Sequence, residues 1–291
     1  MEFNHKNNAK VLFTKEKIGQ YWNDLYKHVA TCLDYHFILR LESSAKIITE
    51  NFPKDAKILD LGCGAGVLSE RLLAAGFSVD AADMSADMRE LTTQRLAKFD
   101  ANKYKIFHAE CEKLEIADST YDLVACIGVF GYIDDVDKAL SEINRVLKPG
   151  GTFIMSIRNE DNRNIFDLAN LFKFVFYKLP RKILKTLTPT KAPHTSNPSG
   201  PGTATPIANK FFIDIFDRPK DVIKLINQFN FSATEFYGLG YGPLQFNGKT
   251  LLPETMAKGM SRMLSSVVRV CRLEKFTKWV ADISIYVFKK H

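Results

Sequence analysis

The sequence predicts an α/β fold with a doubly wound, mostly parallel sheet, and three observations lead to that prediction. Short apolar runs alternate with amphipathic segments along the 291 residues, as in strand–helix–strand units. The first run, residues 58–61, is apolar enough for a buried parallel strand. It ends in Gly62, Gly64 and Gly66, and Val67 opens a segment with helical spacing. A strand, a glycine turn and a helix in this order let the backbone approach a nucleotide-like ligand closely.

Further apolar runs continue the alternation through the first half of the chain. They cover residues 77–82, 105–108, 121–127 and 152–157. Asp83 follows the first of them, at a strand end where a carboxylate can accept both hydroxyls of a ribose. Residues 139–148 predict a helix that Pro149 stops before the last run. Arg145 and Lys148 would then face the negative end of that helix.

The flanking segments are expected to add helices and two closing strands. The predicted helices cover residues 15–51, 217–229 and 253–278, and the predicted strands cover 231–237 and 283–288. The last helix is basic and amphipathic. Between residues 186 and 206, prolines recur among Ser, Thr and Gly, which predicts a long loop.

Two of these runs are similar to motifs of one enzyme family. Residues 60–66, D-L-G-C-G-A-G, resemble the first motif of the class I S-adenosylmethionine (SAM) methyltransferases, and residues 145–151, R-V-L-K-P-G-G, resemble a second. The resemblance covers residues 55–158 and points to the small-molecule, quinone-biosynthesis-like group. It implies a seven-stranded sheet with an antiparallel final strand, the closing pair lying antiparallel beside the fifth strand. It also implies SAM as the cofactor and S-adenosylhomocysteine as its product.

The resemblance also assigns the cofactor site, at the carboxyl edge of the sheet. Asp83 is expected on the ribose, Met84 on one side of the adenine, and the 110–112 turn on the other, with Glu110 where the family usually has Asp. The expected cofactor-binding residues are Tyr21, Asp60, Gly62, Cys63, Gly64, Gly66, Asp83, Met84, Met88, Glu110, Cys111, Glu112, Ile127 and Gly128. For Tyr21, on a helix that often closes over the cofactor in this family, packing in the core is the alternative.

Four regions follow from this organisation. Residues 1–52 are expected as N-terminal helices over the cofactor, 53–158 as the SAM-binding core, 159–216 as a helical cap inserted after the fifth strand, and 217–291 as the end of the core with an added basic helix. The aromatic segment 165–179 would form an apolar roof over the acceptor, or else lie in a membrane interface. For the run Asp134–Asp137, helix capping is favoured over a metal site.

Methyl transfer from SAM is an in-line displacement, so the enzyme mainly aligns the reactants and needs no nucleophile of its own. A hydroxyl acceptor gains from a general base. His194, in the predicted loop, is the expected catalytic residue, with His108 and Tyr132 as the other candidates. The turn after residue 127 lacks the Asn/Asp-Pro-Pro-aromatic sequence of amide and base N-methyltransferases. This leaves the broad group of small-molecule O-, N- or C-methyltransferases, within which transfer to oxygen on a small or lipid-like molecule is the expected reaction.

Charge and cysteine content narrow the partners further. Residues 1–150 hold 19 Lys and Arg against 23 Asp and Glu, whereas residues 151–291 hold 21 against 10. The basic half indicates an anionic partner, which could be the acceptor, a lipid surface or nucleic acid; a solvated basic surface is the alternative. The five cysteines have no metal-ligand spacing and predict reduced thiols and no metal.

The N-terminus has no apolar core typical of a signal peptide, so a cytoplasmic protein with peripheral membrane contact is expected. Two alternative functions stay open, an RNA-directed methyltransferase and a non-catalytic SAM-binding protein. A third interpretation, an NAD-binding domain, lacks the third glycine at dinucleotide spacing. Nucleic acid is the less favoured partner, because the basic segments carry no known RNA-binding module.

Overall fold

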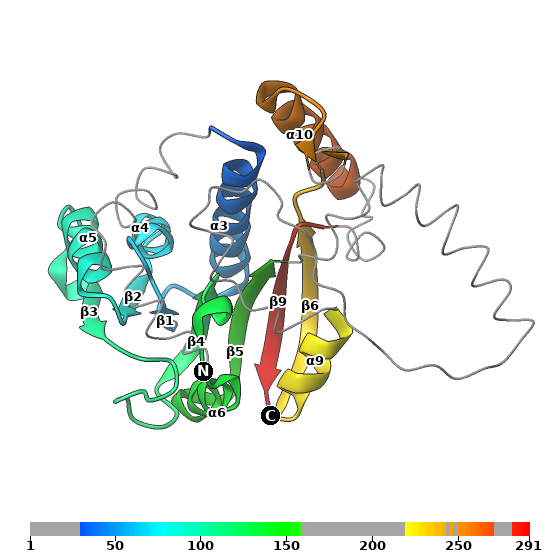
Figure 1. The fold of residues 1–291 in the computed structure, drawn as a ribbon. Helices are drawn as coiled ribbons and strands as arrows, with labels where there is room; N and C mark the ends of the chain where they lie inside the picture. The colour runs from blue at the N-terminus through cyan, green and yellow to red at the C-terminus, as the bar shows by residue number, and fades with distance from the viewer. Residues whose placement is uncertain (1–29, 159–218, 243–244, 247–248, 271–280) are drawn as a thin grey trace, which may run out of the picture.

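The computed structural model describes residues 30–158, 219–242, 245–246, 249–270 and 281–291 (Figure 1). Its centre is a seven-stranded sheet with the strand order β3-β2-β1-β4-β5-β9-β6. The strands are β1 Lys57–Leu61, β2 Ser78–Asp83, β3 Tyr104–His108, β4 Tyr121–Ile127, β5 Leu147–Arg158, β6 Phe231–Leu239 and β9 Ile283–Lys290. Two short strands, β7 Gln245–Phe246 and β8 Lys249–Thr250, pair with each other outside this sheet. The predicted α/β fold with a mostly parallel sheet is confirmed.

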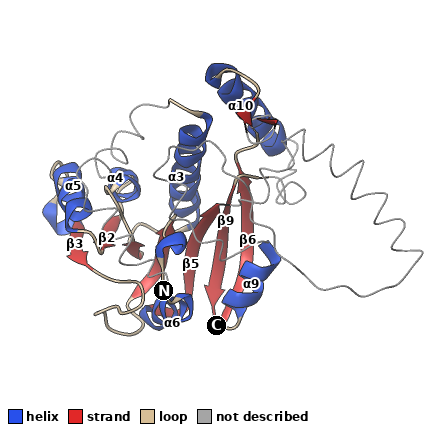
Figure 2. Cartoon of the chain, viewed as in Figure 1, coloured by secondary structure: helices blue, strands red, loops and turns tan. Residues whose placement is uncertain are grey.

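The helices cover both faces of the sheet (Figures 1 and 2). They are α3 Cys32–Asn51, α4 Val67–Ala74, α5 Ala86–Leu96, α6 Val136–Val146, α9 Pro219–Asn227 and α10 Glu254–Val270, with short 3-10 turns η1 Ala101–Lys103 and η2 Phe130–Tyr132. None of the helices described is long and apolar enough to cross a membrane. Helix α10 agrees with the predicted helix 253–278 over residues 254–270, and the rest of that prediction, from residue 271 on, lies outside the described chain.

Side chains that alternate along the central strands pack into two separate hydrophobic clusters, one on each face of the sheet. In β4, Val124 and Cys126 join the cluster beneath α6 and α9, whereas Leu123 and Ala125 join the cluster beneath α3 and α4. The same period of two residues divides β9, because successive side chains of a strand point to opposite faces. The sheet is therefore buried on both sides, and ligands can reach it only at its edges.

The direction of β6 corrects one expectation. The closing pair was expected to be antiparallel to the fifth strand, but only β9 is antiparallel to β5. Strand β6 pairs antiparallel with β9 and so runs in the same direction as β5. The physical reason is the connection: β6 is entered from helix α9, and a helical crossover is the connection that returns a chain as a parallel strand. Strand β9 then fills the gap between β5 and β6, which makes the final strand antiparallel, as expected.

The expected continuous helix over residues 15–51 is wrong at residue 31. Thr31 has an extended backbone, and its side chain accepts a hydrogen bond from the backbone N–H of Asp34, while Asp34 caps Thr31 in return. This capping box satisfies donors at the helix end, so α3 begins at Cys32. Residues 1–29 lie outside the described chain.

Helix α6 and strand β5 also depart from expectation where they meet. Asp135 caps α6 through a hydrogen bond from the N–H of Lys138, which supports capping over a metal site. The helix ends at Val146, and β5 starts at Leu147 instead of residue 152. Lys148 therefore lies in a strand and pairs with Asp122, 2.8 Å away, rather than with the helix end. The register of the β4–β5 ladder shifts here, because Tyr121 pairs with Leu147 but Leu123 pairs with Thr152, so that four residues of β5 stand opposite one residue of β4.

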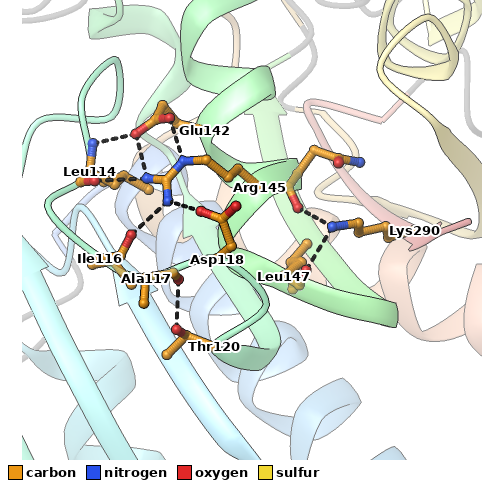
Figure 3. Close-up of polar contacts among 10 residues, drawn as sticks. Leu114, Ile116, Ala117, Asp118, Thr120, Glu142, Arg145, Leu147 and Lys290 are labelled. Carbon is orange, nitrogen blue, oxygen red and sulfur yellow. Dashed lines mark hydrogen bonds and ion pairs between the residues drawn. The ribbon is translucent and has the colours of Figure 1, made fainter.

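Arg145, in the last turn of α6, ties the loop after the 110–112 turn to the helix (Figure 3). Its guanidinium donates to the carbonyl oxygens of Leu114 and Ile116, at 2.8 and 2.7 Å. It also binds both carboxylate oxygens of Glu142, and Glu142 accepts the N–H of Leu114 at 2.7 Å. This network explains in structural terms why an arginine stands at this position of the motif.

Candidate functional site

A cavity opens at the carboxyl ends of β1, β2 and β4. Its lining residues are Arg40, Leu41, Asp60, Gly62, Cys63, Gly64, Ala65, Val67, Leu68, Asp83, Met84, Met88, Ala109, Glu110, Cys111, Glu112, Ile127, Gly128, Val129, Tyr132 and Ile133. Twelve of the fourteen expected cofactor-binding residues are among them, all except Gly66 and Tyr21. Tyr21 lies outside the described residues. The structure thus brings the remaining predicted residues together, and that they bind a cofactor stays a prediction.

The glycine turn after β1 leaves its backbone open to the cavity. Gly62 has φ +74°, and a Cβ there would lie 2.3 Å from Cγ2 of Val129, so no other residue fits without movement. Gly64 has no atom within 4 Å of where its Cβ would be. Gly66 caps the start of α4 beneath the turn and does not line the cavity. A ligand can therefore approach the backbone most closely at Gly64.

Two carboxylates flank this turn. Asp60 is 2% exposed and accepts a hydrogen bond from the hydroxyl of Ser69 at 2.7 Å. Burial raises its pKa to about 6, although the Ser69 hydrogen bond acts in the opposite direction. Asp83 accepts the N–H of Gly64 at 2.9 Å on one oxygen and the N–H of Ser85 at 2.8 Å on the other. Burial also raises the pKa of Asp83. Because a carboxylate offers about four acceptor positions, Asp83 keeps two for a ligand.

The side of the cavity next to β2 and β3 is apolar at its floor and acidic at its rim. Met88 and Cys111 are buried, whereas Glu110 and Glu112 are half-buried. Burial raises the pKa values of the Cys63 and Cys126 thiols, and the neighbouring Cys111 raises that of Cys126 further. Cys63 and Cys126 therefore stay protonated near neutral pH, and the cysteine sulfurs contribute soft packing surface. No cluster of three metal-ligating side chains occurs in the described part of the chain.

Arg40, on α3, is a cavity residue that the sequence reasoning missed. Its guanidinium lies against the end of β4, where a Cβ on Gly128 would come within 2.5 Å of Nη1. Its Cζ also sits 5.0 Å from the ring centre of Phe37. Among the described residues, no carboxylate lies within ion-pair distance of it. The available signal was a lone arginine inside the apolar run 37–41.

Tyr132 lines the cavity from the turn after β4. Burial raises its pKa to about 12, while the nearby guanidinium groups of Arg40 and Arg158 act to lower it. The side chain is therefore a neutral phenol near pH 7, and it can donate a hydrogen bond but does not serve as a ready base. His108, the other described candidate base, is exposed at the end of β3 and is not part of the cavity lining. His194 lies outside the described residues.

Comparison with known proteins gives consistent results for the central segment. Residues 59–155 match the family model of a methyltransferase domain. The chain is 29% identical over 144 residues to a sterol 4-C-methyltransferase of Caenorhabditis elegans, covering 49% of this chain and 38% of that protein. It is 32% identical over 127 residues to a ubiquinone biosynthesis O-methyltransferase of Rickettsia felis, covering 43% and 51%. The chain thus spans about half or less of the length of these two relatives.

A solved structure extends the likeness over the whole fold. Magnesium protoporphyrin IX methyltransferase from Synechocystis, with bound S-adenosylhomocysteine, superimposes with a TM-score of 0.55 at 15% identity. The match covers 99% of this chain and all of that protein. At this identity the likeness concerns the fold alone. The glycine turn, the carboxylate that ends β2 and the strand order all agree with the family match, and residues 59–155 therefore form a class I methyltransferase domain, whose cofactor is SAM.

Proposed function

We propose that this protein transfers the methyl group of SAM to a small, lipid-like acceptor, at an oxygen atom. One observation carries the proposal: a single cavity joins the glycine turn, Asp83, the 110–112 turn and an arginine without a carboxylate partner among the described residues. Each of these groups suits one part of SAM. The open backbone of the glycine turn lets the nucleoside approach closely, and Asp83 suits the two ribose hydroxyls. The 110–112 turn suits the adenine, and the arginine suits the one carboxylate.

The cofactor would lie across the carboxyl ends of β2, β1 and β4. Asp83 would accept the ribose hydroxyls with the two acceptor positions that Gly64 and Ser85 leave. Met84 would flank the adenine, and Glu110 would accept a hydrogen bond from its amino group. Arg40 would bind the carboxylate of the methionine part, since that carboxylate is the only anionic group of SAM and a guanidinium can bind it bidentately.

The reaction would need alignment more than chemical activation. The sulfonium already activates the methyl group, so the protein gains most by holding acceptor oxygen, methyl carbon and sulfur in line. Tyr132 lines the β4 end of the cavity as a neutral phenol, so any role it has in the reaction would be that of a hydrogen-bond donor and not that of a base. His194 remains the proposed general base, from a segment outside the described residues.

The acceptor class is inferred from two sources. The two relatives are named for a sterol and for ubiquinone biosynthesis, which are both lipid-like chemistries. The second half of this chain carries a net charge of +11, which would favour an anionic acceptor or one presented at an anionic membrane surface. We therefore propose peripheral membrane contact for the basic half, which cosedimentation with anionic vesicles at low salt would test.

A transfer assay tests the function. The pure protein is incubated with SAM labelled at the methyl group and, in parallel, with a prenylated catechol, a sterol and total tRNA. We expect label in the prenylated catechol, as a methyl aryl ether that survives mild base, because the acceptor atom is a hydroxyl oxygen. Label in tRNA instead would support the RNA-directed alternative, and binding of SAM without transfer to any acceptor would support a non-catalytic protein.

A further inference from the structure

A buried polar joint connects helix α3 with helix α10 and with the start of β9. His36, on α3, is 1% exposed, and its Nδ1 lies 2.9 Å from Oδ2 of Asp282. Its Nε2 lies 2.8 Å from the hydroxyl oxygen of Ser261 on α10. Ser, His and Asp in this order also occur in hydrolases. Ser261, however, has no exposed surface and does not line the cavity described, so a substrate would not reach its hydroxyl.

More contacts fasten the first two turns of α3 to the same partners. The N–H of Cys32 donates to the carboxylate of Glu254, at the first residue of α10, over 2.9 Å. The guanidinium of Arg262 sits 5.2 Å from the ring centre of Tyr35. Figure 1 shows α10 beside the start of α3, at the ends of β6 and β9. The N-terminal part of α3 is therefore held by an element that lies outside the matched domain.

The imidazole of His36 also fits against the backbone between β6 and β9. The N–H of Asp282 donates to the carbonyl oxygen of Gly240 over 2.8 Å, which closes the ends of the two strands. Gly240 has φ +72°, and a Cβ there would come within 2.7 Å of the His36 ring. Burial by itself would lower the pKa of His36, but the hydrogen bonds with Asp282 and Cys32 raise it to about 9. At neutral pH the joint is therefore a buried ion pair.

The joint lies one turn from the cofactor cavity. Residues four apart on a helix share a face, so His36 and Arg40 project from the same side of α3. Beyond Arg40, the buried residues of the helix pack on the core beneath α4. A slip of α3 by one residue would move it by about 1.5 Å and turn it by about 100°. Such a slip would take the Arg40 guanidinium away from Gly128, and the joint opposes it.

We propose that His36 is a positioning residue that, through Asp282 and Ser261, fixes α3 so that Arg40 meets the carboxylate of SAM. The inference rests on the proposed function, because it assumes that SAM occupies this cavity. The proposal assigns a role to α10, which lies outside the matched domain. Helix α10 would set the affinity for the carboxylate of SAM without contacting the cofactor.

The test compares the affinities of two ligands, SAM and decarboxylated SAM, by titration calorimetry. Decarboxylated SAM keeps the nucleoside, the sulfonium and the amine and lacks only the group that Arg40 would bind. Arg40→Ala should weaken SAM binding on the order of tenfold or more and leave decarboxylated SAM within about twofold. His36→Gln should likewise weaken SAM alone, by several-fold, and it should add nothing in an Arg40→Ala background, because both changes then remove the same interaction.

Controls separate positioning from general loss of stability. Tyr121→Phe removes a side-chain hydrogen bond of 2.8 Å to Asp80, away from α3, and should change neither affinity. Should His36→Gln fail to fold, Ser261→Ala loosens the α10 contact while the His36–Asp282 pair stays. Equal weakening of both ligands, no weakening, or full additivity with Arg40→Ala would each overturn the inference. If the wild-type protein binds neither ligand, the proposed function itself fails, and the inference fails with it.

Discussion

The role of Asp83 makes the most specific prediction about the cofactor. Its two oxygens accept the N–H groups of Gly64 and Ser85, and its remaining two acceptor positions are assigned to the ribose hydroxyls. Asp83→Ala leaves those hydroxyls unpaired in the cavity, which costs about 1–3 kcal/mol of binding free energy. Because about 1.4 kcal/mol is a factor of ten, S-adenosylhomocysteine should bind roughly 5- to 150-fold more weakly.

The assay is titration calorimetry with S-adenosylhomocysteine and with its 2′-deoxyribose analogue. In the wild-type protein the deoxy analogue should bind more weakly, and in Asp83→Ala the two ligands should bind alike, because the partner of the missing hydroxyl is already gone. Asp87→Ala, which removes a carboxylate from the next helix outside the cavity lining, is the matched control. An unchanged affinity in Asp83→Ala would refute the reasoning.

Three further predictions concern the framework of the site. Arg145→Ala should lower the free energy of unfolding by about 2–4 kcal/mol, because the carbonyl oxygens of Leu114 and Ile116 lose their donor; denaturant titration measures this, and an unchanged midpoint would contradict it. Gly62→Ala should abolish measurable SAM binding, because the new Cβ would lie 2.3 Å from Val129 in a left-handed backbone; binding at wild-type strength would show that the turn is not the ligand site. His36 has a pKa raised from 6.5 to about 9, so the folded state binds more protons than the unfolded one between these values, and this contribution to stability is complete below pH 6.5 and lost as the pH rises through 9. Denaturation series from pH 6 to 10 should therefore show a fall in stability that is reduced in His36→Gln, and parallel profiles of the two proteins would exclude the buried ion pair.

The parallel core was predictable because its signals are local. Each strand from β1 to β5 is an apolar run, and the motif residues stand at strand ends, where a doubly wound sheet gathers them. That is why most of the residues expected around the cofactor line one cavity. The prediction that an aspartate of the run 134–137 caps a helix also rested on a local signal, because the cap formed by Asp135 involves only the next three residues.

The parts that sequence reasoning missed depend on contacts between distant segments. Nothing within residues 231–239 marks the direction of β6, because direction follows from which strand it pairs with. Arg40 is recognised as a cavity residue only when α3 is packed against Gly128. The partners His36 and Asp282 are 246 residues apart in sequence, so no spacing rule links them. The start of α3 at Cys32 did have a local signal, because Thr31 and Asp34 form a capping box. We missed it because the hydrophobic periodicity continues across residue 31.

The central claim is that the cavity at the carboxyl ends of β1, β2 and β4 binds SAM. The most direct measurement is titration calorimetry of the wild-type protein with S-adenosylhomocysteine and, separately, with NAD. The account predicts that S-adenosylhomocysteine binds with one site per chain and that NAD gives no heat of binding. Binding of NAD without binding of S-adenosylhomocysteine would contradict the account.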